Sequence, residues 1–585
     1  MIDVNELPHI EELEDIETNF KVHAGPGAGK TTWLISQLER VLKKSNRLGK
    51  TGQIGCITYT NVAADEIIDR LECDKTRFDI STIHSFLYRN IVKPFSYLIE
   101  NSLDGNNLFN ISKLNGHDEH LVHGSRLRRW VNTISKNNGN YWYLLSSENR
   151  DDVICELTSL NYKFEGNEVK LSINQKRGAR IPKSNGELWE YKLKYWGDGI
   201  MHHEDVLYFS YLILSQSEEI TGFIQNKFPY IFVDEFQDTT QLQTRILDII
   251  SAKETKIGVV GDLGQSIYKF AGAVRSDFLE FKKDEISNFK LDHNHRSTHQ
   301  IIDFLNKLRN DINQSYGKDT TVGFPVKVLI GSIDQAKDWF EKKHPDKTLY
   351  ILTRKNASVS EIKGHLGMTT NDKINEMYGN DSNGHRSKLI HSILKGIKYR
   401  DRNDFKNSIK EVLRPLKRIG QEELGKLDLR EIAIDILDDL TIKENRKQSV
   451  FDFYMELKES ISNKYNLKIG ASLQSGKAKT FYENHMIAEL LQYVKVDTKS
   501  EDKIRTIHSA KGAEFKNTLV HFESVEDFRN YIINASSYID GSDDDGRIFY
   551  VACSRAEEKL YINIPEVSKD DITSIANMGA DLIQV

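Results

Sequence analysis

The sequence predicts an α/β fold in which parallel strands alternate with helices that cover the sheets. Three segments indicate this fold. They are an apolar strand, glycine-rich loop and amphipathic helix over residues 20–42, a buried strand over 231–234 that ends in carboxylates, and an apolar strand over 256–261 that ends in a polar loop. A chain of 585 residues exceeds one domain, and 39% hydrophobic residues suffice for several cores. We therefore expect more than one α/β domain.

The glycine-rich loop is typical of a site for nucleotide phosphates. Its sequence is Ala24-Gly25-Pro26-Gly27-Ala28-Gly29-Lys30-Thr31, with Thr32 next. Small residues let backbone N–H groups surround phosphate oxygens, and the following helix N-terminus adds partial positive charge. We expect Lys30 to reach the β and γ phosphates and Thr31 to bind Mg²⁺. The usual first residue is glycine, and Ala24 is small enough to replace it.

The helix after this loop is predicted from its periodicity. Apolar residues at 34, 38, 41 and 42 recur at i, i+4, i+7 and i+8, which places them on one face. The order strand, loop, helix is the context in which such a loop binds phosphate.

The second strand ends in the carboxylates of Asp234 and Glu235. Residues 231–233 are apolar, and a Gln-Asp pair follows at 237–238. Asp234 is suited to hold a Mg²⁺ ion, and Glu235 to polarise a water molecule against a terminal phosphate. Taken alone, acidic residues at a strand end are solvated turn residues as often as they are part of a nucleotide site.

Three later residues extend the candidate nucleotide site. Gln265 lies in the loop after the strand at 256–261, where it could sense a phosphate. Arg296 lies in the segment 291–297, and Arg555 in the segment 550–556. Two arginines far apart in sequence suggest side chains that both reach one nucleotide, although a surface ion pair is the commoner role of a single arginine.

Composition limits the function classes and the compartment. The net charge of −6 shows no global basicity, so nucleic-acid binding would have to use local patches. The amino-terminal segment is acidic and no run of 18 apolar residues occurs, so we expect a soluble protein that is not exported. The cysteines are scattered without metal-ligand or disulfide spacing, which fits a reducing cytoplasm. They are Cys56, Cys73, Cys155 and Cys553.

In their order, these segments resemble the superfamily 1A DNA helicases of the UvrD, Rep and PcrA type. Three more segments match that family: residues 57–64, 81–86 and 504–515. All the matches are collinear and lie in three blocks, residues 20–90, 230–300 and 500–565. The resemblance implies two RecA-like motor domains, each a parallel sheet flanked by helices and each with a mainly helical insertion.

The resemblance implies an ATPase site in which Glu235 positions or deprotonates the attacking water. Arg296 and Arg555 would stabilise charge on the γ phosphate. Glu514 resembles the family residue that touches the ribose, and Tyr268 the one that stacks on the adenine. The implied catalytic residues are Lys30, Asp234, Glu235, Gln265, Arg296 and Arg555, with Thr31 and Asp234 as Mg²⁺ ligands.

Contacts to single-stranded DNA are also implied by the family's positions, since bases stack on aromatic faces and phosphates need polar partners. The alternative for these side chains is ordinary packing at strand ends. The implied residues are Tyr59, Asn61, His84, Phe270 and His508.

Two departures from the family pattern stand out. After the segment 265–268, which ends in Tyr268, relatives commonly carry an arginine before a Gly-Ala pair, but Ala271-Gly272-Ala273 follows Phe270 here, so a basic DNA contact is missing. Relatives also place an adenine-reading glutamine before the phosphate loop, and no glutamine precedes Gln37. We therefore expect loose selectivity for the nucleotide base.

The intervals between the motifs predict two insertions. The first carries basic clusters with aromatic residues at 126–130, 141–143 and 176–180, which suit either a nucleic-acid surface or a solvated face. The expected domain order is 1–90 (first motor domain, first part), 91–200 (insertion), 201–285 (first motor domain, second part), 286–360 (second motor domain, first part), 361–480 (insertion) and 481–585 (second motor domain, second part).

Two functional hypotheses follow, both with ATP and Mg²⁺ as cofactors and DNA as a partner. The first is an ATP-dependent translocase or helicase that moves 3′ to 5′ on single-stranded or 3′-tailed DNA, in DNA repair or anti-phage defence. The second is a helicase-like ATPase that senses DNA ends and regulates a partner nuclease, as in compact UvrD-like subunits of Gabija-type defence systems. The compact size of the chain favours the second hypothesis. An RNA motor is disfavoured by the Gln-Asp pair at 237–238 and by the segment around Arg555.

Overall fold

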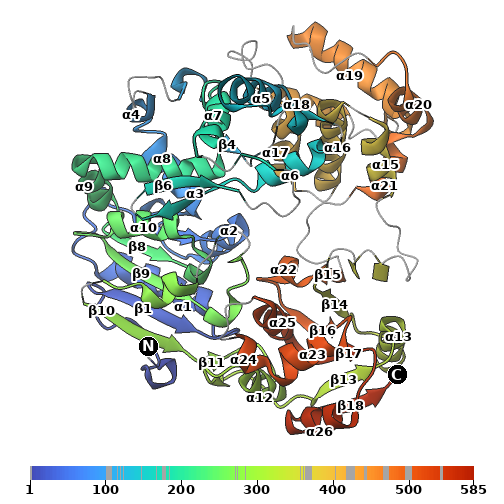
Figure 1. Ribbon diagram of the computed structural model, residues 1–585. Coiled ribbons are helices and arrows are strands. Elements are labelled where there is room, and N and C mark those ends of the chain that lie inside the picture. Colours follow the sequence, from blue (N-terminus) through green and yellow to red (C-terminus); the bar gives the residue numbers. More distant parts are fainter. Residues whose placement is uncertain are drawn as a thin grey trace. The chain divides into compact units, whose positions relative to one another are not determined.

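The chain forms two compact units, residues 1–354 with 507–585 and residues 355–506. The computed structural model in Figure 1 describes residues 3–585 except 101–108, 115, 119, 121, 123, 147, 167, 174–179, 183–184, 270–271, 273–274, 284, 356–357, 360, 363–371, 382, 402–403, 417–428, 440–444, 466–472, 495–502 and 540–543. Among these residues, no helix is long and apolar enough to cross a membrane.

The first unit contains a parallel sheet with the strand order β10-β1-β9-β8-β2-β3. Its central strands β2, β8 and β9 are almost fully buried, as strands covered on both faces are, whereas the edge strand β10 is half-buried along most of its length. The strands are β1 (Asn19–Ala24), β2 (Ile54–Thr58), β3 (Phe78–Thr82), β8 (Tyr230–Val233), β9 (Lys256–Gly261) and β10 (Ile286–Leu291). The helices that accompany them are α1 (Lys30–Lys44), α2 (Asn61–Arg70), α3 (Ile83–Leu87), α8 (His203–Gln216), α9 (Glu218–Lys227), α10 (Gln241–Ile250) and α11 (Arg275–Glu280).

A second parallel sheet contains, within the same unit, the strands β14-β16-β17-β13-β18 in this order. It packs its own hydrophobic core, separate from that of the first sheet. The strands are β13 (Val326–Ile330), β14 (Tyr350–Thr353), β16 (Phe515–His521), β17 (Ala556–Ile564) and β18 (Ala580–Gln584). The helices are α12 (His299–Leu308), α13 (Ile333–Lys343), α22 (Ile507–Ala510), α23 (Val525–Phe528), α24 (Ala535–Ile539), α25 (Asp545–Cys553) and α26 (Lys569–Asn577). The predicted α/β class with two parallel sheets is confirmed.

The chain leaves the first sheet after Leu291, because β10 pairs with β1 along its whole length. This strand lies beyond residue 285, where the sequence had suggested the change of domain. A short parallel pair then follows, β11 (His293–Asn294) with β12 (Ser315–Tyr316).

The first insertion continues the core of the first sheet. Trp130 is fully buried there and donates from its indole Nε1 to the carbonyl of Glu187 at 2.6 Å. Arg126 and Arg129 both donate to Asp198, so two charges of the basic cluster at 126–130 are already paired. Of the cluster at 176–180, residues 176–179 lie outside the described part of the chain. The elements are α4 (Tyr97–Glu100), β4 (His117–Asp118), α5 (Gly124–Asn138), α6 (Arg150–Thr158), β5 (Asn161–Glu165), β6 (Glu168–Ser172), α7 (Asn185–Trp196) and β7 (Met201–His202).

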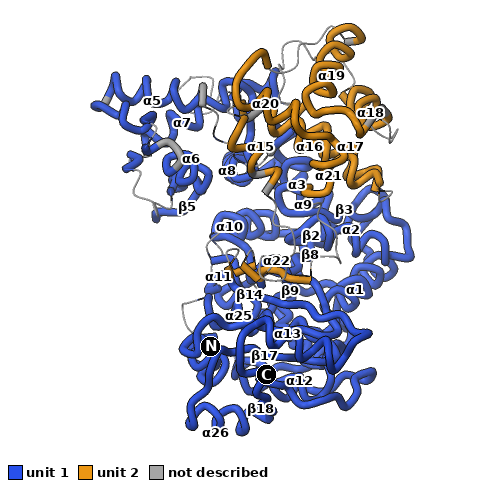
Figure 2. Tube along the Cα trace, turned by 90° about the vertical axis from the view of Figure 1, so that its right-hand side faces the viewer, with its two compact units in different colours: residues 1–354, 507–585 blue, residues 355–506 orange. Residues whose placement is uncertain are grey.

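The second unit, residues 355–506, is mainly helical and has its own core (Figure 2). Phe481, Tyr482 and Leu490 pack into that core, so the unit extends past residue 480. Its elements are α15 (Asp372–Asn380), α16 (Gly384–Arg400), α17 (Phe405–Leu416), α18 (Leu429–Asp439), α19 (Val450–Tyr465), α20 (Lys477–Asn484), α21 (Ile487–Tyr493) and β15 (Ile504–Thr506).

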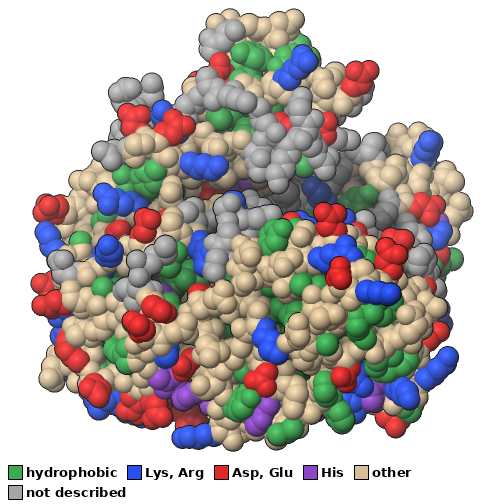
Figure 3. All heavy atoms as spheres, turned by 60° about the horizontal axis from the view of Figure 1, so that its bottom comes forward, with side chains coloured by type: hydrophobic (Ala, Val, Ile, Leu, Met, Phe, Trp, Pro, Cys, Tyr) green, Lys and Arg blue, Asp and Glu red, His purple; other side chains and the backbone are tan. Residues whose placement is uncertain are grey.

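The surface carries both signs of charge close together. Figure 3 shows lysine and arginine side chains interspersed with aspartate and glutamate over one face of the molecule. This mixture agrees with the net charge of −6 and gives that face no single basic field.

Candidate nucleotide and nucleic-acid site

The phosphate loop joins β1 to α1, as the sequence predicted. Gly27 and Gly29 adopt left-handed backbone angles of φ 68° and 73°, which other residues rarely adopt. A Cβ atom on Gly27 would also lie 2.7 Å from Asn294 Oδ1, and one on Gly25 would lie 2.3 Å from Gln314 Nε2. The loop therefore needs glycine for its conformation and for the close approach of residues 294–314.

Lys30 and the two carboxylates meet at the end of β8. The Lys30 ammonium donates to Glu235 Oε1 at 3.0 Å, and the Glu235 backbone N–H donates to Asp234 Oδ1 at 2.9 Å. Glu235 itself has a left-handed φ of 53°, which is uncommon for a residue other than glycine and typical of functional sites. Thr31 is half-buried, whereas Thr32 is exposed and its hydroxyl accepts from Arg70 at 2.7 Å.

The two carboxylates have pKa values on opposite sides of their usual range. Burial, and then the charge of Glu235, raise the pKa of Asp234 to about 6. Burial also opposes ionisation of Glu235, but Lys30 and Lys511 outweigh it and lower its pKa to about 2. Glu235 is therefore the ionised partner of Lys30, and a cation beside Asp234 would favour its carboxylate form.

Gln265 joins the loop after β9 to the second sheet. Its amide donates to Asp262 Oδ2 at 2.6 Å, and its Oε1 accepts from Arg555 Nη2 at 2.5 Å. Asp262 is fully buried and also accepts from Arg309 Nη1 at 2.8 Å. Burial, followed by the charge of Arg296, lowers the pKa of Arg555 to about 9, which still leaves it protonated at neutral pH.

Arg296 lies against the phosphate loop but is paired with Glu514. Its Nε donates to Glu514 Oε1 at 2.8 Å, and its Nη1 donates to the carbonyl of Ser554 at 3.1 Å. The segment is held locally because Asn294 Oδ1 accepts from the Arg296 backbone N–H at 2.9 Å and the His295 N–H donates to the Gly27 carbonyl at 2.8 Å. Two residues expected at the nucleotide thus contact one another.

Two residues to which the sequence suggested no role make contacts at this site. The Lys511 ammonium donates to Asp238 Oδ2 at 2.5 Å and to the carbonyl of Gln265 at 2.7 Å. Lys511 lies in the matched segment 504–515, which was its only sequence signal. Gln314 donates to the Pro26 carbonyl at 2.9 Å, and no motif indicated it.

The aromatic residues form a separate group. The rings of Tyr59 and Tyr268 are stacked, with centroids 4.7 Å apart and planes at 20°. Lys511 lies 4.6 Å from the centre of the Tyr268 ring, and His508 lies 6.4 Å from it. Tyr268, expected at the adenine, is thus grouped with Tyr59 and His508, which were expected at DNA. Asn61 is exposed at the start of α2, and Phe270 lies outside the described residues.

His84 belongs to a cluster of histidines. Its ring centroid lies 5.6 Å from that of His203, whose Nδ1 lies 2.7 Å from His117 Nδ1. Burial, and then the neighbouring His203 and His117, lower the pKa of His84 to about 3. The imidazole is therefore neutral at pH 7 and can contact a phosphate only as a neutral hydrogen-bond donor.

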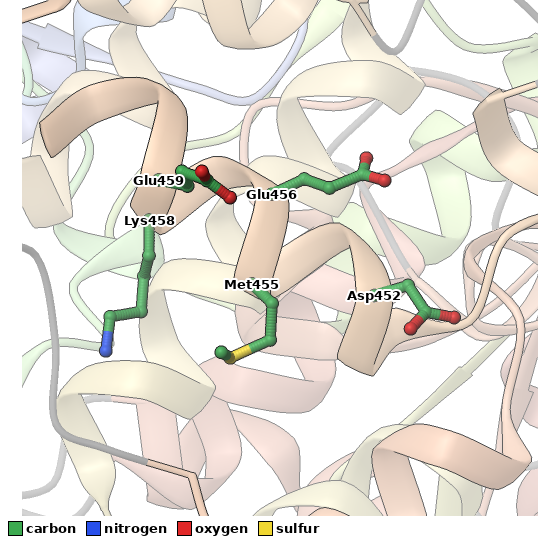
Figure 4. A pocket seen from close by; sticks show the side chains of 5 residues that line it. All are labelled: Asp452, Met455, Glu456, Lys458 and Glu459. Atoms are coloured by element: carbon green, nitrogen blue, oxygen red, sulfur yellow. The ribbon is translucent and has the colours of Figure 1, made fainter. Parts of the chain in front are cut away.

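One further hollow, in the second unit, is lined by residues of α19 alone (Figure 4). Its side chains are Asp452, Met455, Glu456, Lys458 and Glu459. It contains none of the residues that the motifs singled out.

Comparison with known proteins gives two family matches. The model described as UvrD/REP helicase N-terminal domain matches residues 9–286, and the one described as UvrD-like helicase C-terminal domain matches residues 443–566. The Gabija protein GajB of Bacillus cereus (strain HuB5-5) is 24% identical over 671 residues, which cover 94% of this chain and 93% of that protein. A probable DNA helicase II homolog of Mycoplasma genitalium is 24% identical over 612 residues, covering 92% of this chain and 82% of the relative.

Proposed function

Since this chain belongs to the UvrD-like helicase family, we propose that it is an ATP-driven motor that moves 3′ to 5′ along single-stranded DNA. The observation that carries the proposal is the hydrogen bond from Arg555 Nη2 to Gln265 Oε1 at 2.5 Å. It joins the half of the unit that contains the second sheet to the loop after β9 of the first sheet. A phosphate group that displaces this contact would change how the two halves close on each other.

The side chains fit ATP and Mg²⁺. Thr31 and Asp234 would supply oxygen ligands, the type that Mg²⁺ prefers, and the raised pKa of Asp234 indicates a carboxylate that a cation would stabilise. When bound, Mg²⁺ would neutralise charge on the phosphates.

Hydrolysis would use the residues now paired around the loop. A triphosphate competes with Glu235 for the Lys30 ammonium, which frees the Glu235 carboxylate to orient or deprotonate the attacking water. Arg555 and Arg296 would stabilise the charge that develops on the γ phosphate, an effect worth roughly 10³–10⁵ in rate for arginine fingers. Arg296 must first leave Glu514, which would be free to meet the ribose.

Grip on DNA would come from the stacked pair of Tyr59 and Tyr268. Tyr59 is 43% exposed, so a base can stack on its free face, while Tyr268 contacts Lys511 of the second half. Lys511 also binds Asp238 and the Gln265 carbonyl, so the stacking surface is connected to the phosphate site. This connection supports coupling between hydrolysis and movement on the strand.

The test is hydrolysis and strand displacement by the full chain on duplexes with a 3′ or a 5′ tail. Lys30→Ala should abolish DNA-stimulated hydrolysis, and Glu235→Gln should retain ATP bound without turning it over. Lys44→Ala, in the last turn of α1, is the matched control and should hydrolyse ATP at the parental rate. Displacement of 5′-tailed duplexes alone would contradict the polarity, and parental hydrolysis by either site variant would contradict the site.

A second candidate function is favoured by similarity to GajB over 94% of this chain. In that case the chain would be an ATPase that senses DNA ends and regulates a partner nuclease without processive unwinding. DNA-stimulated hydrolysis without strand displacement would support this role, and robust displacement by the isolated chain would count against it. Similarity to GajB favours a role in anti-phage defence, whereas similarity to DNA helicase II homologs favours a role in DNA repair.

A further inference from the structure

A cluster of metal-binding side chains lies where the amino-terminal segment meets the segment after β10. His9, Asp292 and His293 each offer one ligand atom, and these atoms all lie within 4.8 Å of one another. Among the residues that the structure describes, no other group of three histidine, cysteine or acidic side chains meets the same criterion. The cluster contains none of the residues expected at the phosphates.

The geometry of the cluster is set by Asp292. Its side chain is buried, its Oδ1 lies 2.7 Å from His9 Nδ1, and its Oδ2 lies 3.1 Å from the Lys290 ammonium. The Lys290 ammonium also donates to the Asn5 carbonyl at 2.8 Å, and this second contact fixes its position. The rings of His9 and His293 lie with their centroids 4.0 Å apart and their planes at 37°. The Asp292 carboxylate thus lies close to both imidazoles, while Lys290 contacts its Oδ2.

We infer that His9, Asp292 and His293 form a binding site for a transition-metal ion such as Zn²⁺. Two imidazole nitrogens and one carboxylate oxygen suit Zn²⁺, Co²⁺ and Ni²⁺, whereas Mg²⁺ prefers oxygen ligands alone. Three protein ligands leave room for water in the coordination sphere. The lysine on the second carboxylate oxygen plays the orienting role that outer-shell partners have at metal sites.

The metal would tie two distant parts of the chain together. Residues 8–10 run parallel to β10, because the Lys290 N–H donates to the Pro8 carbonyl and the Ile10 N–H to the Lys290 carbonyl, both at 3.0 Å. The amino terminus accordingly lies beside this sheet in Figure 1. Residues 8–10 thus lie along the edge of the sheet, and an ion held by His9 and His293 would join them to the segment that follows β10.

That segment leads directly to the nucleotide site. His293 is followed by Asn294, which holds the Arg296 backbone, and by His295, whose N–H donates to the Gly27 carbonyl of the phosphate loop at 2.8 Å. A bound ion would therefore hold the first residues of the segment that carries Arg296. The site would stabilise the placement of that arginine without touching the nucleotide.

The experiment is titration of the full chain with Zn²⁺ after removal of metals by a chelator, in excess Mg²⁺ so that oxygen-lined sites are occupied. Calorimetry should give one Zn²⁺ per chain, and Co²⁺ should give a ligand-field absorption band with the same stoichiometry. His9→Ala and His293→Ala should each weaken binding by about 10- to 100-fold or more, since even outer-shell changes have effects of that size. His117→Ala, from the other histidine cluster, should bind as the parent does.

Hydrogen exchange on the unmodified chain gives a second readout that does not depend on how the variants fold. Zn²⁺ should slow exchange in residues 5–10 and 290–296. The inference is overturned if the parent binds no stoichiometric Zn²⁺ in excess Mg²⁺. It is also overturned if both histidine variants bind like the parent, or if the protected segments lie elsewhere.

Discussion

At pH 9, where Asp238 is ionised in the parent, Lys511→Met should destabilise the unit that contains both sheets by about 3–5 kcal/mol, the usual effect of removing one partner of a buried ion pair. The Lys511 side chain is 9% exposed and that of Asp238 is 0% exposed, so solvent screens their interaction little. The methionine side chain is one atom shorter than that of lysine but similar in shape, and the substitution leaves Asp238 in the interior without its cation. The destabilisation therefore measures the loss of the cation beside a buried carboxyl rather than a large cavity.

The destabilisation caused by Lys511→Met should depend on pH in a defined direction. Burial, opposed by Lys511, raises the pKa of Asp238 to about 7 in the parent, and removal of Lys511 raises it further. A carboxyl whose folded pKa lies above its unfolded value makes folding less favourable as pH rises, until the folded pKa is passed. In the parent, stability stops falling a little above pH 7, because the folded pKa of Asp238 has been passed. In the variant, in which that pKa is higher, stability continues to fall. The difference in stability between the two proteins should therefore widen from pH 7 to pH 9.

Urea unfolding followed by tryptophan fluorescence measures this unit selectively. All 6 tryptophans lie in the first unit, at positions 33, 130, 142, 189, 196 and 339. A cycle with Asp238→Asn and the double variant isolates the pair, because the double variant leaves no buried charge unpaired. We expect a coupling energy of about 2 kcal/mol or more.

Lys516→Met is the matched control for this cycle. Lys516 is 73% exposed and lies 3.5 Å from Glu558, so its loss should change stability by less than about 1 kcal/mol. If the effects of Lys511→Met and Asp238→Asn add to within about 0.5 kcal/mol, the two side chains do not form an energetically important pair, and the reasoning is refuted.

Three further predictions concern DNA, acid and the nucleotide. Tyr59→Ala should weaken single-stranded DNA binding by about 1–3 kcal/mol in fluorescence anisotropy, while Tyr97→Ala, at an exposed position away from the site motifs, should not; equal losses would remove the stacking role. Because burial lowers the pKa of His84 to about 3, the stability that it contributes above pH 6.5 should be lost as pH falls towards 3. His84→Gln should flatten that slope in thermal unfolding, and an unchanged slope would contradict it. The chain should hydrolyse ATP, GTP and CTP at similar rates, since no glutamine precedes the phosphate loop. A strong preference for ATP would contradict this prediction.

The sequence was informative wherever function depends on neighbouring residues. The loop at 24–31 and the pair Asp234–Glu235 could be predicted with their strands and helix, because glycine conformation, apolar runs and helix periodicity are local properties. Collinear motifs then indicated the family, which the comparison with known proteins confirmed. The same local signals could not set the limits of the units. The sheet or core to which β10 or α21 belongs is decided by the elements against which it packs.

Only the tertiary structure decided which of these residues meet. The pairs Lys511–Asp238, Arg555–Gln265 and Arg296–Glu514 join positions more than 200 residues apart, and no periodicity relates them. It also placed Tyr268 on Tyr59 and brought His9 to Asp292. The sequence by itself determined the chemical groups and the strand ends that carry them. Their partners were decided by the fold, because hydrogen bonds and ion pairs act over a few ångströms in space whatever the separation along the chain.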